Sequence, residues 1–403
     1  MGRTRVKELD FHGKAGINFT RPLTATADGK MHASYEIGFD GGFGLVHREP
    51  VHEDMAIAAF IASKFQFPIA TTYKNLDRTQ WEFIRGLIWN DDPSCLLFKN
   101  STESNCEFDG LGEKFGLAFK FGSRICMTQR SHFGDLQFLH CMASCMGEDA
   151  RVTRDRAIAW FEVMYKLAIG QGVTENDRLA EKFPGDFHAS SEPNGDSSLR
   201  DLLLGTTPAY SGSDIPRRAL GSCLHLIQDS YAVGHTLRRL LNPEDLEARD
   251  DKSYARFKPG TYAKLGSIIT FHTYAGQSNR HGHYDESPDQ RDPGNSNTFN
   301  QTIGARDAIE KCTKLLDLYV SKTKWEDGVA DLIVKEVLAL DDNATTSDSQ
   351  VDERFGMPDT SNDQKLPACE NSWHSGVEKR MDLESGLTCD ERGDFTGSKQ
   401  NKY

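Results

Sequence analysis

The sequence lacks the features that mark several large classes of protein. No stretch of its 403 residues approaches eighteen consecutive apolar side chains, so we expect no transmembrane segment. None of the nine cysteines stands in a CxxC pair, which argues against a cysteine zinc finger. Several cysteines, including Cys141, Cys223 and Cys312, stand in apolar runs, and we expect reduced thiols. The N-terminus has no apolar signal core, so we expect a protein that is either cytoplasmic or exported without a cleavable signal peptide.

The chain also lacks an excess of basic residues. Its 47 lysines and arginines are outnumbered by 60 aspartates and glutamates, which gives a net charge of −13 at pH 7. A protein that coats nucleic acid usually presents a basic face, so stable nucleic-acid binding is not expected. An enzyme that cuts phosphodiesters in a metal-lined pocket remains compatible with this charge. No G-x-S-x-G motif offers a serine nucleophile as a rival mechanism.

Helical patterns dominate the middle of the chain. Apolar residues recur at helical spacing in the ranges 51–65, 79–89, 134–146, 155–172, 214–241, 261–276, 305–320 and 325–340. A polar segment rich in proline, glycine and serine, residues 173–213, is expected to be a long loop. The pattern predicts a mainly α, multi-helix bundle over residues 51–341. Irregular or short-strand structure is expected for the extension 1–50, packed on this core, and a loosely docked polar tail for 342–403.

The most informative stretch runs from Leu224 to Leu237 and reads LHLIQDSYAVGHTL. His225 and Asp229 are four residues apart, so on a helix they share one face. His235 follows ten residues after His225, which turns it about 80° around the helix axis. Burying a carboxylate and two imidazoles in an apolar segment is costly unless something compensates for them. A divalent metal ion would do so, since zinc binds histidine nitrogen and carboxylate oxygen.

Histidine and aspartate recur at helix starts and in loops on both sides of this stretch. His52 opens the first core helix, the turn WND places Asp91 after the second, and SHFGD contains His132. Farther on, RHGHYDE repeats the H-x3-D spacing with His281 and Asp285. The pattern leaves three alternatives open, namely Asp92 for Asp91, His140 for His132, and His283 for His281.

These elements together resemble the zinc-dependent phospholipase C and S1/P1 nuclease superfamily. HLIQDSYAVGH matches the H-x3-D-x5-H signature of that superfamily, HGHYD its H-x3-(E/D) signature, and WND its W-x-D turn. The matching elements lie in the same order over residues 52–285. Among the members, the sequence looks most similar to the long bacterial and fungal phospholipases C that hydrolyse phosphatidylcholine. The resemblance implies an all-α bundle with a cluster of two or three zinc ions at the bottom of a cleft.

The resemblance also implies which residues bind each zinc ion. The first site would comprise Asp91, His132, His225 and Asp229. The second would comprise His235, His281 and Asp285. The third would comprise His52 and the shared carboxylate of Asp229. Relatives complete the third site with an N-terminal tryptophan, and no tryptophan precedes His52 here. Either His12, His32 or His47 replaces that group, or the third site is weak or empty.

The chemistry implied by the resemblance is hydrolysis of a phosphodiester by metal-activated water. Zinc lowers the pKa of bound water and neutralises charge on phosphoryl oxygens, and Asp91 would orient that water or take its proton. The expected enzyme is a phospholipase C that releases diacylglycerol and a phosphorylated headgroup from dispersed or membrane phospholipid. Loop aromatics such as Phe65, Phe67, Tyr73 and Tyr284 are candidate lipid contacts. The alternatives are a single-strand nuclease or 3′-nucleotidase, and a non-catalytic, metal-stabilised helical protein.

Overall fold

The computed structural model describes residues 51–73, 75–95, 126–145, 147–187, 191–205, 213–247, 256–273 and 291–347. It also places the backbone of six short strands that pair as three antiparallel hairpins. These strands are β1 (Ile37–Asp40), β2 (Gly44–His47), β3 (Phe98–Thr102), β4 (Asn105–Phe108), β8 (Thr388–Cys389) and β9 (Phe395–Thr396). The short strands expected within residues 1–50 are therefore present as the hairpin of β1 and β2.

Helices predominate in the described part of the chain, and the expectation of a mainly α protein is confirmed at that level. The α-helices are α1 (Val51–Ala62), α2 (Arg78–Ile88), α4 (Met127–Phe133), α5 (Ala150–Ile169), α6 (Leu179–Lys182), α7 (Leu199–Leu204), α8 (Ile215–Tyr231), α10 (Ala305–Val320) and α11 (Val329–Leu332). Shorter helical turns are η1 (Gln137–His140), η2 (Pro243–Asp245), η4 (Ser296–Phe299), η5 (Trp325–Asp327) and η6 (Ile333–Val337). None of the described helices is long and apolar enough to cross a bilayer.

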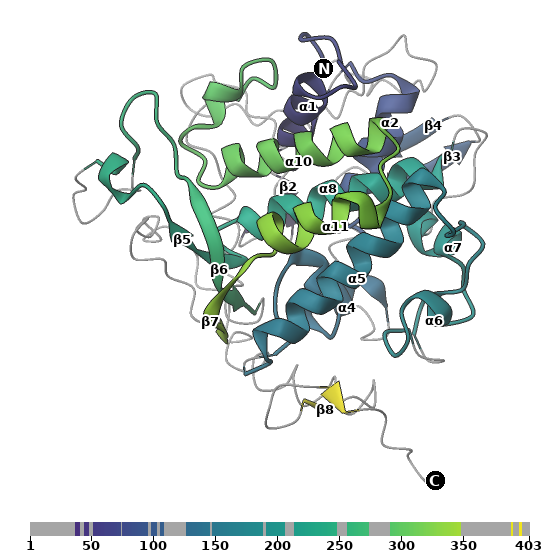
Figure 1. The fold of residues 1–403 in the computed structure, drawn as a ribbon. Coiled ribbons are helices and arrows are strands. Elements are labelled where there is room, and N and C mark those ends of the chain that lie inside the picture. Colours follow the sequence, from purple (N-terminus) through teal and green to yellow (C-terminus); the bar gives the residue numbers. More distant parts are fainter. Residues whose placement is uncertain are drawn as a thin grey trace.

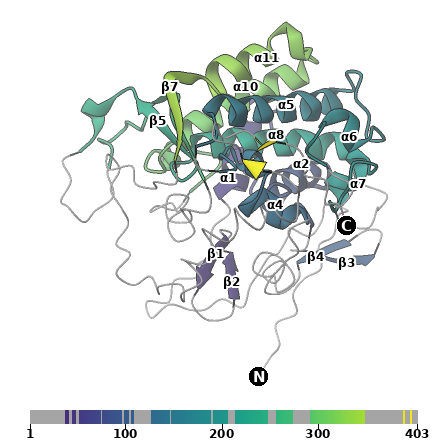
Figure 2. The ribbon, with the colours of Figure 1, turned by 90° about the horizontal axis from the view of Figure 1, so that it is seen from below.

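Helix α8 is the centre of the arrangement. It packs against α2, α5 and α10, and α1 lies mainly against α10 (Figures 1 and 2). Asp214 caps its first turn by accepting a hydrogen bond from the backbone N–H of Arg217, and Pro216 stands in that turn. Every residue of α8 from Arg218 to Tyr231 is buried. A helix buried on all sides must find partners for its polar side chains inside the protein.

Helices α2 and α8 cross with their backbones in contact at two glycines. A Cβ atom at Gly221 would lie 2.1 Å from the carbonyl oxygen of Phe83, and one at Gly86 would lie 2.0 Å from the carbonyl oxygen of Arg218. Beside this crossing, Arg218 Nε donates to Glu82 Oε2 over 2.9 Å, with both side chains buried. The crossing holds the C-terminal end of α2 against the middle of α8.

A small sheet replaces helix that the sequence pattern predicts in two places. Strand β6 (Leu265–His272) pairs antiparallel with β5 (Thr236–Leu240) and parallel with β7 (Leu340–Ser347). The predicted helix over 261–276 is wrong, because its run of β-branched and aromatic residues from Ile268 to Phe271 favours a strand that can pair on both edges. The helix predicted over 214–241 is also too long, since it ends at Tyr231 where Ala232 turns to extended backbone.

The other differences from the predicted pattern concern short elements. The helix predicted over 325–340 is divided into η5, α11 and the π-helix η6, after which the polar strand β7 runs across the expected boundary at 341 and 342. Strand β7 is held by backbone hydrogen bonds to β6, which an amphipathic pattern does not report. Within 134–146 only η1 is helical, and α6 and α7 lie inside the segment that was predicted to be a long loop.

The structure bears on two expectations about individual side chains. Cys145 is disulfide-bonded, so reduced thiols are wrong for this residue, whereas Cys95, Cys126, Cys141, Cys223 and Cys312 form no disulfide, as expected. Phe67 stacks on Phe60 with ring centroids 4.5 Å apart, Phe65 joins the same aromatic cluster, and Tyr73 is buried. The burial of Tyr73 excludes it as a lipid contact, whereas Phe65 and Phe67 are partly buried and stay predictions. Tyr284 lies outside the described residues.

The contact between α2 and α8 generates a test of the fold. Gly221→Ala should lower the free energy of unfolding by about 3 kcal/mol, because the added methyl group meets backbone atoms that cannot move aside. Gly266→Ala is the matched control, since its Cβ would meet Leu241, an exposed and flexible side chain, and we expect a change of about 0.5 kcal/mol or less. Urea unfolding followed by circular dichroism measures both, and equal effects would contradict the close crossing.

Candidate metal centre

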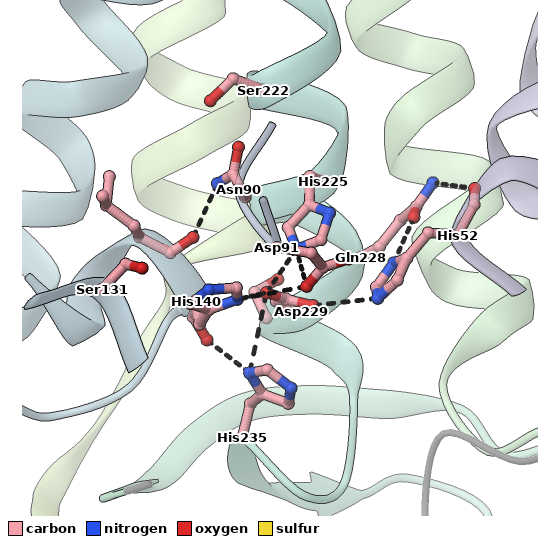
Figure 3. Close-up of polar contacts among 12 residues, drawn as sticks. His52, Asn90, Asp91, Ser131, His140, Ser222, His225, Gln228, Asp229 and His235 are labelled. Atoms are coloured by element: carbon pink, nitrogen blue, oxygen red, sulfur yellow. Dashed lines mark hydrogen bonds and ion pairs between the residues drawn. The ribbon is translucent and has the colours of Figure 1, made fainter. Parts of the chain in front are cut away.

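Six polar side chains from five different elements converge at the C-terminal half of α8 (Figure 3). They come from α1, the turn after α2, η1, α8 itself and the residue that precedes β5. The six residues are His52, Asp91, His140, His225, Asp229 and His235. Five of them are among the predicted zinc ligands, and His140 was the alternative to His132. The structure thus brings together residues that are up to 183 positions apart in the sequence.

Asp229 lies at the middle of this cluster and is 1% exposed. Its Oδ2 is 3.0 Å from His140 Nδ1, 3.0 Å from His225 Nε2 and 3.8 Å from His235 Nδ1. Its Oδ1 is 3.5 Å from His52 Nε2 and has no hydrogen-bond partner among the described residues. The contact with His225 is at ion-pair distance but lacks the alignment of a hydrogen bond. One carboxylate therefore has four imidazoles around it.

Two groups of three donors within the cluster can each hold a metal ion. One consists of His52, His225 and Asp229, and the other of Asp91, His140 and His225, with the donor atoms of each group within 4.8 Å of one another. Asp91 Oδ1 lies 3.7 Å from His225 Nε2 and 3.9 Å from His140 Nδ1. His225 belongs to both groups, and because a neutral imidazole has one lone pair, it can bind an ion in only one of them at a time.

The turn after α2 places Asp91 in the cluster and keeps Asp92 out of it. Trp89 is fully buried, stacks on Trp160 with ring centroids 5.4 Å apart, and donates from Nε1 to the carbonyl oxygen of Leu202 over 2.9 Å. With this residue fixed, the side chain of Asp91 is 31% exposed at the edge of the cluster, whereas Asp92 is fully buried. Of the two adjacent carboxylates, Asp91 is the one within reach of the imidazoles.

His140, the alternative to His132, belongs to one of the two donor groups. His132 is buried beside it, with ring centroids 4.7 Å apart, but its Nδ1 bonds to the backbone carbonyl of Thr128 over 2.8 Å. His140 instead approaches both Asp91 and Asp229. The motif SHFGD points to His132 by local sequence, whereas the approach of His140 depends on η1 and on Cys141, which adopts a left-handed conformation with φ of 54°. No local signal distinguishes the two histidines.

The remaining predicted ligands cannot be placed beside this cluster. His281 and Asp285, together with the alternative His283, lie outside the described residues. His12 and His32 lie outside them as well, and only the backbone of His47 is described. His235 is in place next to Asp229, and its Nδ1 lies 2.5 Å from the carbonyl oxygen of His140. The predicted second site is therefore represented here by His235 alone.

Burial and mutual attraction set the charge states of the carboxylates and of His225. Burial would raise the pKa of Asp229, but the imidazoles of His225 and His235 outweigh it and hold the pKa well below its usual range. The pKa of Asp91 is likewise lowered against the effect of burial, by His225 and His52. Burial lowers the pKa of His225, but the two carboxylates overcome this effect and raise it to about 9. Both carboxylates are thus anionic at neutral pH.

Burial drives three further imidazoles, those of His52, His132 and His235, to their neutral form. Burial, aided by neighbouring imidazoles, lowers the pKa of His132 to about 3 and that of His235 to about 4, and it lowers the pKa of His52 in the same direction. A neutral imidazole has one nitrogen with a free lone pair, which is the form that binds metal. At neutral pH the site offers lone pairs and anionic oxygens together.

The buried polar atoms without partners fit a metal ion. Among the described residues, His140 Nε2, both ring nitrogens of His225, and Asp229 Oδ1 have no hydrogen-bond partner. Such groups normally find one, because each unsatisfied buried atom costs about 1–3 kcal/mol. A divalent cation would satisfy nitrogen and carboxylate donors at once and compensate the buried negative charge.

Comparison with known proteins places no further constraint on this site, since no protein-family model, curated protein or solved structure matches the chain.

Two substitutions decide which histidine completes the cluster. His140→Ala should reduce the metal bound per chain, because it removes a nitrogen that faces both carboxylates. His132→Ala should leave the bound metal near the wild-type amount, because His140 belongs to one of the two donor groups among the described residues and His132 to neither. Both residues are 3% exposed or less, so the two variants remove similar packing. Metal content is measured by mass spectrometry after gel filtration. Loss of metal with His132→Ala alone would reverse the assignment.

Glu53 supplies a pH dependence in the metal-free protein. This residue is 6% exposed, and burial raises its pKa from 4.5 to about 8. Between these values the folded state binds more protons than the unfolded state, so stability is lost as the pH rises from about 4.5 to 8. Glu53→Gln should remove the loss and raise the free energy of unfolding by about 3–5 kcal/mol above pH 8, with little change at pH 4. Urea unfolding of chelator-treated protein across this range measures the difference. A constant difference at all pH values would contradict the burial of a neutral carboxyl group.

Proposed function

We propose that the protein is a zinc-dependent phosphodiester hydrolase, and specifically a phospholipase C of the phospholipase C and S1/P1 nuclease superfamily. One observation carries the proposal: the carboxylate of Asp229, 1% exposed, lies within 3.8 Å of four imidazoles, beside the partly exposed carboxylate of Asp91. The same residue types, in the same order along the chain, underlie the sequence resemblance.

The composition of the donor set favours zinc over magnesium or calcium. Magnesium and calcium prefer oxygen ligands, whereas imidazole nitrogen suits zinc. Imidazoles outnumber carboxylates in the cluster, and two of the three donors in each group are histidines. The central Asp229 also fits two ions held close together, the arrangement used for phosphoryl chemistry, because its two oxygens face different imidazoles.

The partial exposure of the cluster supports a catalytic role in preference to a purely structural one. Structural zinc sites are closed by four protein ligands, whereas catalytic sites keep a position open for water or substrate. Here the side chain of Asp91 is 31% exposed and that of His52 is 20% exposed, while His140, His225 and Asp229 are buried. The cluster therefore has a buried floor and an accessible edge.

Asp91 has the position and the charge of the group that handles the proton. It is anionic at neutral pH because the surrounding imidazoles lower its pKa, and it is the more exposed of the two carboxylates. Zinc, when bound, supplies Lewis acidity toward phosphoryl oxygen and lowers the pKa of water. Asp91 then orients the attacking water and accepts its proton, while Asp229 holds the histidines around it.

A lipid substrate is favoured over nucleic acid by the charge of the chain. A net charge of −13 disfavours a long polyanion such as single-stranded nucleic acid more than it does a phospholipid with a single phosphodiester. The sequence resemblance to phospholipases C favours the same class of substrate.

The function is tested by offering two substrates to the same preparation. Zinc-loaded protein is incubated in parallel with phosphatidylcholine vesicles and with single-stranded DNA. We expect release of phosphocholine and diacylglycerol, abolished by a chelator and restored by added zinc. His225→Ala should reduce turnover by at least about a thousandfold, because this residue belongs to both donor groups.

Other outcomes have distinct meanings. Cleavage of DNA without release of phosphocholine would replace the phospholipase with a nuclease on the same metal centre. Bound zinc without hydrolysis of either substrate would favour a metal-stabilised, non-catalytic protein. Undiminished turnover in His225→Ala would contradict the metal centre itself. Circular dichroism of the variant separates loss of the site from loss of the fold.

A further inference from the structure

Gln228 is a buried carboxamide that the proposed chemistry leaves without a role. It precedes Asp229 on α8 and is 2% exposed, in a helix that is otherwise rich in apolar side chains. Its side chain reaches across to α1 and contacts one residue twice. Oε1 lies 2.6 Å from His52 Nδ1, and Nε2 donates to the backbone carbonyl oxygen of His52 over 3.1 Å (Figure 3).

The two contacts determine the protonation of the ring. A backbone carbonyl oxygen can only accept, so the amide NH₂ of Gln228 must face His52 O, which directs Oε1 toward the ring. A carboxamide oxygen also only accepts, and His52 Nδ1 must therefore carry a proton and donate it. The neutral imidazole has a single N–H, which leaves the lone pair on Nε2.

That lone pair lies on the side of the ring that faces the cluster. His52 Nε2 is 3.5 Å from Asp229 Oδ1, the oxygen that has no hydrogen-bond partner among the residues with described side chains. The ring also stacks on His225, with centroids 4.3 Å apart and an angle of 28° between planes. Gln228 and Asp229, consecutive on α8, thus contact the two opposite nitrogens of one imidazole.

We propose that Gln228 is a positioning residue that fixes His52 as the Nδ1–H tautomer and so presents its Nε2 to a metal ion shared with Asp229. The proposal rests on the metal centre proposed above. Partners of this kind, which hold the second nitrogen of a ligating histidine, typically change metal affinity 10–100-fold when removed. The double contact also ties the start of α1 to α8, since one of the two bonds is to the backbone.

The experiment reads the tautomer of His52 directly, without relying on turnover. Metal-free protein labelled with ¹⁵N-histidine is studied by long-range ¹H–¹⁵N correlation at pH 7.5, with the His52 signals assigned from their loss in His52→Gln. The wild type should show the Nδ1–H tautomer. Zinc affinity is then measured by competition with a chromogenic chelator, and we expect Gln228→Leu to weaken it about 10–100-fold.

Two further variants separate the role of Gln228 from general effects of packing. Gln228→Glu keeps an acceptor for Nδ1–H but no donor for His52 O, so it should retain the tautomer and bind zinc more tightly than Gln228→Leu. Asn242→Leu is the matched control. Asn242 is 4% exposed and makes three hydrogen bonds through its side chain, none of them to the cluster, so this variant should keep the wild-type zinc affinity.

The outcomes distinguish the inference from the function on which it rests. An Nε2–H tautomer in the wild type would overturn the role of Gln228, even if Gln228→Leu fails to fold. Wild-type affinity and an unchanged tautomer in Gln228→Leu would overturn it as well. An Nδ1–H tautomer that is lost in Gln228→Leu supports the positioning role. If the wild type also binds no zinc, that absence of binding rejects the metal centre and leaves the contact between Gln228 and His52 in place.

Discussion

The rest of the structure depends on one buried anion, the carboxylate of Asp229. At 1% exposure on a helix that is packed on all sides, an uncompensated carboxylate would cost several kcal/mol. The fold compensates it with imidazoles from separate parts of the chain. Of these, His225 is cationic at neutral pH because the carboxylates raise its pKa to about 9, whereas burial lowers the pKa values of His52 and His235 and keeps both rings neutral. Both ring nitrogens of His225 and Oδ1 of Asp229 have no hydrogen-bond partner among the described residues. A bound divalent cation would take up these donor atoms in place of the His225 proton.

The packing of the helices determines where those imidazoles stand. Gly86 and Gly221 let α2 approach α8 closely, and Trp89 then fixes the turn that carries Asp91. In the same turn, Asn90 Nδ2 donates to the carbonyl oxygen of Leu139 over 2.7 Å, which ties the residue before Asp91 to the residue before His140. At the end of α8, Arg238 stacks on Tyr231 at 3.9 Å and donates to the carbonyl oxygen of Ser230, which sets the direction of the chain through His235. These few packing contacts therefore determine the relative positions of the side chains in the cluster.

The sequence predicted the centre better than its surroundings. His225 and Asp229 share one face of α8, as their four-residue spacing predicted, and the predominance of helix followed from the same periodicity. His235 instead reaches Asp229 through the extended chain that follows Tyr231, so the helical spacing assumed for it was wrong. The strand β6 was missed because its β-branched run was weighed as helix, and β7 because a polar strand is stabilised through its backbone. His140 could not be preferred over His132, since its approach to Asp91 and Asp229 arises from the left-handed turn at Cys141 and from tertiary contacts. Residues joined by tertiary contact alone lie beyond what a local pattern can report.

The proposed function and the proposed role of Gln228 both require that a metal ion binds between the carboxylates and imidazoles around α8. X-ray diffraction from crystals of the zinc-loaded protein, recorded on both sides of the zinc absorption edge, tests it directly. We expect an anomalous peak from bound zinc, present only above the edge and within about 2.0–2.3 Å of atoms of His225 and of Asp91 or Asp229. An ordered cluster with these side chains in place and no anomalous peak near α8 would contradict it.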